Sequence, residues 1–111
     1  MKTAVAGKPA EIDATSKEFV KCLVEATKNG VAYDPTASGV EFAFTTTKTG
    51  AGATYYTGSW ETMSGQHYAR CLVGPGAGTT VLTAGETYYV WVRITDDPEI
   101  PAKYGGLLVV T

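Results

Sequence analysis

Turn signals recur about every ten residues along this chain of 111 residues, and their spacing restricts the fold more than any other feature. Between the turns lie short segments, rich in Val, Thr, Tyr and Phe, in which apolar residues occupy every second position. Period two places alternate side chains on opposite faces of a strand. The turns fall at Asn29-Gly30, Asp34-Pro35, Ser38-Gly39, Ser64-Gly65, Asp97-Pro98 and Gly105-Gly106, with glycine-rich runs at 49–52 and 74–78. This pattern is typical of an all-β sandwich or barrel.

About seven segments have the composition and length of strands. They are residues 19–27, 40–45, 54–62, 67–73, 81–82, 88–95 and 104–111. An α-helix over residues 18–28 is the one alternative, because Phe19, Cys22 and Ala26 also have helical spacing. The β-branched residues and the Asn29-Gly30 turn that follows favour a strand there. Residues 46–53, rich in Gly, Ala and Thr, are predicted to form a loop.

The turn before the strand at 88–95 gives the strongest indication of the fold. Leu82 and Gly85 followed by Tyr88 resemble a tyrosine corner, in which a tyrosine hydroxyl bonds back to the backbone where the chain crosses between two sheets. The usual spacing has one residue between the glycine and the tyrosine, whereas Glu86 and Thr87 both intervene here. Either a β-bulge accommodates the extra residue, or this turn resembles a tyrosine corner less closely than the residue types suggest. We therefore predict an immunoglobulin-like antiparallel β-sandwich of about seven strands.

The two cysteines, Cys22 and Cys71, each lie on the apolar face of a predicted strand. In antibody domains the second bridging cysteine follows the corner tyrosine, whereas Cys71 precedes Tyr88. We expect two buried free thiols, with a disulfide as the alternative, because no export signal precedes the domain.

The chain is predicted to be one domain at residues 16–111, preceded by a polar N-terminal arm at residues 1–15. The arm has too little apolar periodicity to pack alone, so we expect it to become ordered on assembly with a neighbouring subunit. It has no apolar leader, and no segment of the chain has the length of a membrane span. These features predict a protein that is made and kept in a cytoplasm, or released from one by lysis.

Nine basic and eleven acidic residues give a formal charge of −2, and the basic residues are not clustered. A protein that binds nucleic acid through its phosphates needs such a cluster, so we expect neither nucleic acid nor membrane as a partner.

No grouping of residues indicates catalysis or a cofactor. His67 is the one histidine, and Ser59 and Ser64 near it lack the surroundings of an activated nucleophile. The cysteines and the histidine do not have the spacing of zinc ligands, and the glycine-rich run at 74–78 lacks the lysine of a phosphate-binding loop. Asp96, Asp97 and Glu99 form an acidic group that could bind calcium. The same residues are also typical of an ordinary turn at the end of a strand. We predict a non-enzymatic protein without metal or cofactor.

Aromatic residues supply the candidate site. If Tyr88, Val90 and Val92 face the core, the other side chains of that strand point outward, and Trp, Tyr and Arg dominate protein interfaces. The predicted protein-interface residues are Tyr89, Trp91, Arg93, Trp60 and Tyr68.

Two other interpretations of these aromatics stay open. The rings could simply cover a sheet and pair across its strands. They could also form a platform for a sugar, with Arg70, Arg93 and Gln66 beside it to bond hydroxyl groups.

Several ordered motifs add a resemblance. They are Ala-Tyr-Asp-Pro-Thr at 32–36, Val-Glu-Phe-Ala-Phe at 40–44, Ser-Trp-Glu-Thr at 59–62, Tyr-Ala-Arg-Cys-Leu-Val-Gly-Pro-Gly at 68–76 and Tyr-Val-Trp-Val-Arg-Ile-Thr-Asp-Asp-Pro-Glu-Ile-Pro at 89–101. Together they resemble small immunoglobulin-like virion structural proteins of tailed phages that infect actinobacteria.

The resemblance implies a structural role without catalysis. The first expectation is a capsid decoration protein of the virion, assembled in the host cytoplasm, which binds the shell of major capsid protein, stabilises it and forms a homo-oligomer in the particle. The alternatives are a head–tail connector or tail-associated protein, or a carbohydrate-binding adhesion module on the virion surface.

Overall fold

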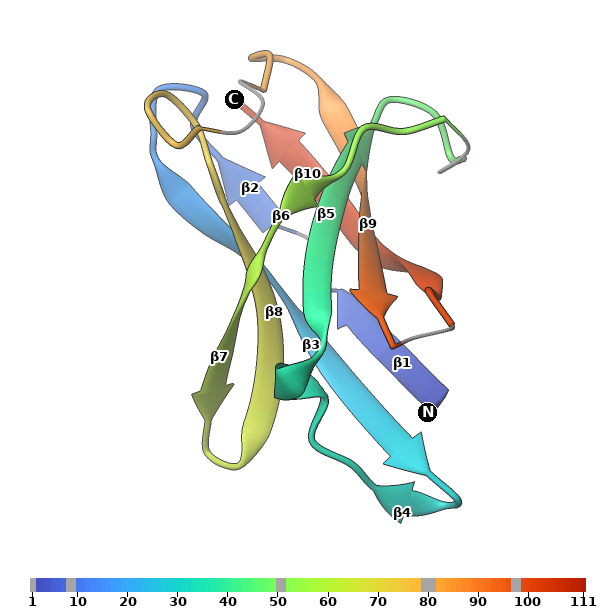
Figure 1. Cartoon of the computed structure of the whole chain (residues 1–111). Helices are drawn as coiled ribbons and strands as arrows, with labels where there is room; N and C mark the ends of the chain where they lie inside the picture. The colour runs from blue at the N-terminus through green and yellow to red at the C-terminus, as the bar shows by residue number, and fades with distance from the viewer. Residues whose placement is uncertain (1, 8–9, 50–51, 79–81, 97–98) are drawn as a thin grey trace.

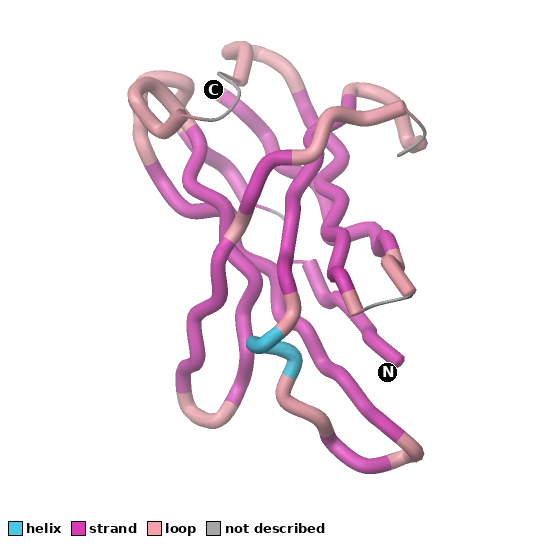
Figure 2. The backbone as a smooth tube through the Cα atoms, viewed as in Figure 1, coloured by secondary structure: helices cyan, strands magenta, loops and turns pink. Residues whose placement is uncertain are grey.

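A computed structural model describes residues 2–7, 10–49, 52–78, 82–96 and 99–111. These residues form ten strands in two facing sheets and one short 3-10 helical turn (Figures 1 and 2). The predicted all-β sandwich is confirmed, and the strand predicted at 19–27, in preference to a helix over 18–28, is also confirmed. The predicted number of about seven strands was too low, because the described residues form ten.

The strand order in each sheet follows from the backbone pairing. The first sheet has the order β1 (Lys2–Gly7), β3 (Glu18–Lys28), β8 (Gln66–Val73) and β7 (Ser59–Met63), and β4 (Val31–Ala32) pairs with the end of β3. The second sheet has the order β2 (Ala10–Ile12), β10 (Ala102–Val110), β9 (Thr87–Thr95), β5 (Gly39–Thr45) and β6 (Tyr56–Thr57). The helical turn η1 (Pro35–Ala37) leads into β5.

This order is that of an immunoglobulin-like sandwich. The first sheet corresponds to strands A, B, E and D, and the second to G, F and C with an added C′ strand. Described neighbours are antiparallel, except that β2 runs parallel to β10. The first strand of the fold is therefore divided between the two sheets, as β1 in one and β2 in the other.

The N-terminal segment differs from the separate arm expected at residues 1–15. β1 pairs along its length with β3, from Lys2 opposite Thr27 to Gly7 opposite Cys22, and β2 pairs with the end of β10. Val5 packs against the core, and Ile12 belongs to it. Backbone pairing with two longer strands thus incorporates a polar segment into the sandwich.

Gly58 divides the predicted strand at 54–62 into β6 and β7, which belong to different sheets. Its amide donates a hydrogen bond to the carbonyl of Val40 at 2.8 Å. A Cβ atom at this position would lie 2.7 Å from the carbonyl oxygen of Arg70 and 3.0 Å from the ring of Phe42. The chain can cross between the sheets here because glycine has no side chain.

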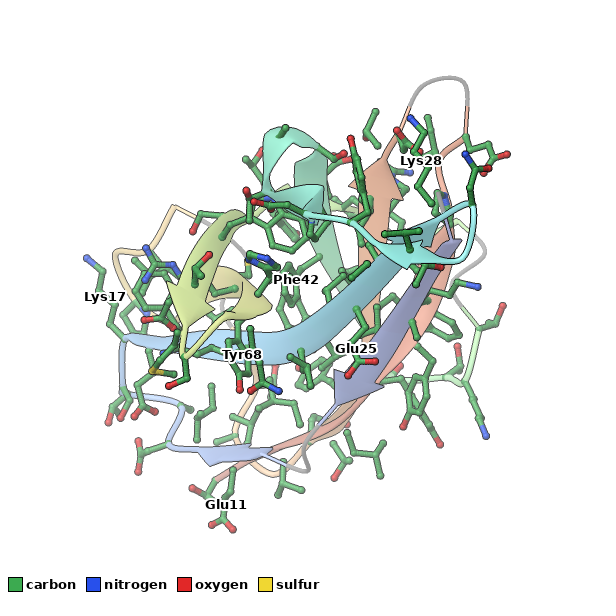
Figure 3. The ribbon with its side chains drawn as sticks, turned by 90° about the horizontal axis from the view of Figure 1, so that it is seen from below. Glu11, Lys17, Glu25, Lys28, Phe42 and Tyr68 are labelled. Carbon is green, nitrogen blue, oxygen red and sulfur yellow. The ribbon has the colours of Figure 1, made fainter. Side chains whose placement is uncertain are left out.

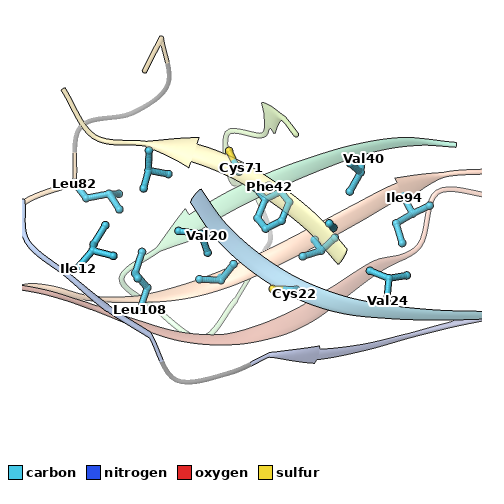
Figure 4. Close-up of a cluster of buried hydrophobic side chains, with 14 of the residues drawn as sticks. Ile12, Val20, Cys22, Val24, Val40, Phe42, Cys71, Leu82, Ile94 and Leu108 are labelled. Atoms are coloured by element: carbon cyan, nitrogen blue, oxygen red, sulfur yellow. The ribbon is translucent and has the colours of Figure 1, made fainter. Parts of the chain in front are cut away.

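The core fills the space between the sheets. Phe42 lies at its centre, whereas Glu11 and Lys17 reach outward (Figure 3). The predicted alternation is confirmed in β3, β5, β8 and β9, whose inward residues make up most of the cluster in Figure 4. Leu82 is buried in that cluster but belongs to no strand, and Val81, the other residue of the short strand predicted at 81–82, lies outside the described residues.

The tyrosine corner is present despite its extra residue. The amide of Thr83 donates a hydrogen bond to the hydroxyl oxygen of Tyr88 at 2.9 Å. Gly85 has a φ of +87° and donates its amide to the carbonyl of Val110 at 2.7 Å. The turn thus accommodates both Glu86 and Thr87 while it connects the two sheets.

Both cysteines are buried free thiols. They lie on adjacent strands of one sheet, where Cys22 pairs with Ala69 and Cys71 with Val20. Desolvation raises the pKa of Cys22 to about 12 and that of Cys71 to about 11. The thiol of Cys22 donates to the carbonyl of Gly105 at 3.6 Å. The expectation of free thiols is therefore confirmed.

Candidate interaction surface

The outer face of the second sheet carries three of the predicted interface residues. Val90, Val92 and Ile94 of β9 are buried, so Tyr89, Trp91 and Arg93 point away from the core. The register with β5 gives each of them a cross-strand neighbour: Thr45 for Tyr89, Ala43 for Trp91 and Glu41 for Arg93. β9 therefore holds its outward side chains at the middle of the sheet, between β5 and β10.

Aromatic rings gather around Tyr104 of β10, which pairs with Trp91. The ring centroids of Trp91 and Tyr104 are 5.5 Å apart with an angle of 59° between the planes, and those of Tyr89 and Tyr104 are 6.0 Å apart at 47°. The indole N–H of Trp91 donates to Oγ1 of Thr45 at 3.1 Å. These tilted ring contacts and the hydrogen bond fix the orientation of the rings.

A β-bulge in β10 extends this aromatic surface. Gly105 is the extra residue, because Tyr104 pairs with Trp91 and Gly106 already pairs with Val90. The inserted residue shifts the parity of the strand, so that Leu107 and Val109 share the outer face with Tyr104. Tyr104, Leu107 and Val109 are 37%, 38% and 40% exposed. We call Tyr89, Trp91, Tyr104, Leu107 and Val109 the outer patch.

Arg93 borders the outer patch on the side of β5. Its guanidinium donates from Nη2 and Nε to Oε1 of Glu41, at 2.9 and 3.1 Å, and lies 3.9 Å from the ring centroid of Tyr55. The charge of Arg93 is therefore neutralised within the sheet. It provides a fixed polar margin to an apolar surface.

Trp60 and Tyr68 lie elsewhere. Trp60 of β7 pairs with Ala69, packs against the core and donates its indole N–H to the carbonyl of Ser38 at 2.8 Å. Tyr68 is on the outer face of the first sheet, where its hydroxyl donates to Oε1 of Gln66 at 3.1 Å. The structure thus brings together Tyr89, Trp91 and Arg93 and separates the other two predicted residues from them.

The outer face of the first sheet has a different character because it carries a group of paired charges. Lys21 and Arg70 lie 2.6 Å and 3.9 Å from the carboxylate of Glu61. The guanidinium of Arg70 also covers the ring of Phe19, with 4.3 Å between the guanidinium carbon and the ring centroid. This face is a mixed polar surface, whereas the outer patch is predominantly apolar.

The residues considered for catalysis are held in other contacts. Nδ1 of His67 lies 2.9 Å from Oγ1 of Thr62, and its Nε2 lies 3.7 Å from the carboxylate of Asp34. Oγ of Ser59 accepts a hydrogen bond from Arg70 at 3.0 Å. The serine and the histidine therefore engage separate partners.

In the acidic group considered for calcium, Asp96 and Glu99 exchange two backbone hydrogen bonds. Asp97 lies outside the described residues. Within the described part of the chain, no three His, Cys, Asp or Glu side chains gather as metal ligands. No helix among those residues is long and apolar enough to cross a membrane.

The fold and the surface together define an immunoglobulin-like sandwich with an exposed apolar patch on the sheet that contains β9 and β10. Comparison with known proteins adds no assignment: no protein-family model matches the chain, and the search of curated proteins gives no match.

Proposed function

We propose that this protein is a non-enzymatic structural protein of a tailed-phage virion, which decorates the capsid by binding the shell of major capsid protein. The proposal combines the ordered sequence motifs that resemble such proteins with the outer patch of the second sheet. The observation that carries it is the exposed apolar row of Tyr104, Leu107 and Val109 beside Trp91 and Tyr89.

The outer patch has the properties of a protein-binding surface. Its residues lie on two hydrogen-bonded strands, so little backbone freedom is lost when a partner binds. Trp91 and Tyr89 are already oriented by contacts with Tyr104, and aromatic residues dominate interface energies. A contiguous apolar surface with a polar margin, here Arg93 and Glu41, is typical of interaction sites.

A protein partner suits this geometry better than a sugar. Several coplanar rings would give a sugar a flat platform, whereas the rings of Trp91 and Tyr89 are inclined at 59° and 47° to Tyr104 and do not lie in one plane with it. Leu107 and Val109 add aliphatic surface area. This area contributes most to the binding free energy when apolar side chains of a partner cover it.

A repeated shell also lowers the affinity that each contact needs. If the protein forms an oligomer on the particle, each subunit that binds raises the effective concentration of the others. A modest patch on each copy can then hold many copies in place.

Copy number in purified particles tests the assignment to a virion. We expect a copy number comparable with that of the major shell protein. A few copies per particle would instead indicate a head–tail connector or a tail protein, and absence from the particles would contradict a virion role.

Binding to shells that lack the protein tests the surface. Leu107→Glu places a charge in the outer patch and is expected to weaken cosedimentation at least about tenfold, because an unpaired charge would be covered by apolar surface. Met63→Glu is the matched control, since Met63 is 50% exposed but lies on the first sheet. Equal binding by both variants and the unchanged protein would exclude the outer patch as the contact.

A further inference from the structure

A pocket of about 360 Å³ opens at the end of the sandwich opposite the tyrosine corner. It is lined by residues 23–27 of β3, residues 32–34 after the β3–β4 turn, and residues 65–67 at the start of β8. β3 continues past its last pair with β8, Val24 with His67, before it pairs with β4 at Thr27. The pocket occupies the interval between the two partners of β3. Figure 3 views the molecule from this end, with Glu25 and Lys28 labelled.

The lining of this pocket is acidic. It contains the carboxylates of Glu25 and Asp34, and its lining residues include neither lysine nor arginine. Among the described side chains, no cationic group is within ion-pair distance of Glu25. Lys28 lies near the rim, with its ammonium 5.4 Å from the ring centroid of Tyr33. Two acidic residues therefore line a cavity whose lining also includes His67, with the ammonium of Lys28 near its margin.

Asp34 is held as a carboxylate in a defined orientation. Its Oδ1 accepts hydrogen bonds from the amide and hydroxyl of Thr36, at 2.9 and 2.7 Å, and caps η1. These hydrogen bonds, chiefly the one from the hydroxyl, hold the pKa of Asp34 below its ordinary value, so it is ionised at neutral pH. The 3.7 Å contact with His67 also uses Oδ1, which leaves Oδ2 unused by any of these partners.

We propose that this pocket binds a basic side chain, lysine or arginine, of a partner protein. The stem of such a side chain would lie against Leu23 and Ala32, and its charged end would meet the carboxylates of Glu25 and Asp34. The ring of Tyr33, which is 38% exposed, attracts cations and already has the ammonium of Lys28 5.4 Å from its centroid.

This contact is independent of the function proposed above. The pocket is formed by the first sheet and the turns at its end, whereas the outer patch lies on the second sheet. Loss of one contact would therefore leave the other intact, and the two proposals can fail separately.

The probes are the capped amino acids Nα-acetyl-lysine-N-methylamide, the corresponding arginine compound and the uncharged norleucine compound, titrated into the ¹⁵N-labelled full chain. We expect lysine and arginine to shift the amide signals of Thr27, Gln66 and His67. Norleucine should bind up to about fivefold more weakly, the largest factor that one exposed ion pair supplies. Similar affinity for norleucine and lysine would show that charge does not select the ligand and would overturn the proposal.

The double variant Glu25→Gln/Asp34→Asn tests the two carboxylates directly. Asparagine can still cap η1, so the fold should be retained. We expect the affinity for the lysine probe to fall at least about fivefold, whereas Glu11→Gln, an exposed control on β2, should leave it unchanged. Unchanged binding by the double variant would reject the assignment. A titration with spermidine tests a free polyamine as the ligand. If spermidine binds more tightly than either capped amino acid, the ligand is a free polyamine and a protein side chain is rejected.

Discussion

The backbone of Gly74, just after β8, lies directly against the carbonyl group of Ser16, just before β3. A Cβ atom on residue 74 would overlap the Ser16 oxygen and would lie 3.1 Å from Cα of Lys17. Gly74 also has a φ of +106°, which L side chains rarely adopt. Two segments that are far apart in the sequence can therefore pack together at the end of the first sheet only where residue 74 has no side chain.

Gly74→Ala should accordingly lower the free energy of unfolding by about 3 kcal/mol, because backbone strain and steric overlap act together. Gly76→Ala is the matched control: Gly76 has a φ of +78°, but nothing lies within 4 Å of its hypothetical Cβ. That variant should lose only about 1 kcal/mol, from backbone strain alone. Urea unfolding of both variants measures the difference. Equal losses would mean that the contact with Ser16 relaxes at little cost.

Tyr88→Phe removes the hydroxyl that accepts the amide of Thr83 at 2.9 Å. We expect a loss of about 1 kcal/mol in the free energy of unfolding, the net contribution of one hydrogen bond. Tyr89→Phe is the neighbouring control, since the ring contact of Tyr89 with Tyr104 does not require its hydroxyl. Chemical unfolding followed by circular dichroism compares them. A Tyr88→Phe protein as stable as the Tyr89→Phe protein would show that the corner hydrogen bond is energetically neutral.

Local sequence signals were sufficient where one strand and its turn decide the outcome. Alternation in β9 placed Tyr89, Trp91 and Arg93 on one face, and the structure shows them there. The corner tyrosine was recognisable because glycine, leucine and Tyr88 lie within a few residues of each other. Such features depend on the side-chain period of a strand and on short-range backbone geometry, both of which a sequence displays directly.

Features that depend on distant parts of the chain were missed. Leu107 and Val109 reach the outer face only because the bulge at Gly105 shifts the parity of β10, and the opposing strand defines that bulge. Trp60, like Trp91, is a tryptophan on a predicted strand, but it faces inward. Gly58 moves the chain into the other sheet just before Trp60. β1 and β2 are short, and their pairing partners β3 and β10 determine their conformation.

Cys22 and Cys71 should react very slowly with a thiol reagent in the native protein at mildly alkaline pH. Burial raises their pKa values to about 12 and about 11, so little thiolate forms, and thiolate is the reactive species. We expect the reaction rate to rise with denaturant in parallel with unfolding. The single variants Cys22→Ala and Cys71→Ala assign the rate to each thiol. Native-state reaction as fast as that of a free cysteine would contradict the observed burial.

Acid should destabilise the protein in part through Glu61. The hydrogen bond from Lys21, at 2.6 Å, is the main cause that lowers the pKa of Glu61 below its ordinary 4.5, and the charges of Lys21 and Arg70 act in the same direction. A carboxyl whose pKa is lower in the folded state stabilises the fold above its unfolded pKa, and this contribution is lost as the pH falls through the folded value. The expected window therefore begins near pH 4.5 and extends below it.

Glu61→Gln should show a shallower loss of stability over this acid range than the unchanged protein, because the titrating group is gone. Lys21→Met removes the principal hydrogen-bond donor to Glu61 and should make the loss shallower as well. Some acid dependence will remain in both variants, since hydrogen bonds from Thr15 and Thr36 lower the pKa values of Asp13 and Asp34. Urea midpoints measured at neutral pH and at several values below 4.5 give the slopes. If Glu61→Gln loses stability on acidification as steeply as the unchanged protein, the Lys21–Glu61 contact does not contribute to folding and must be only a surface association.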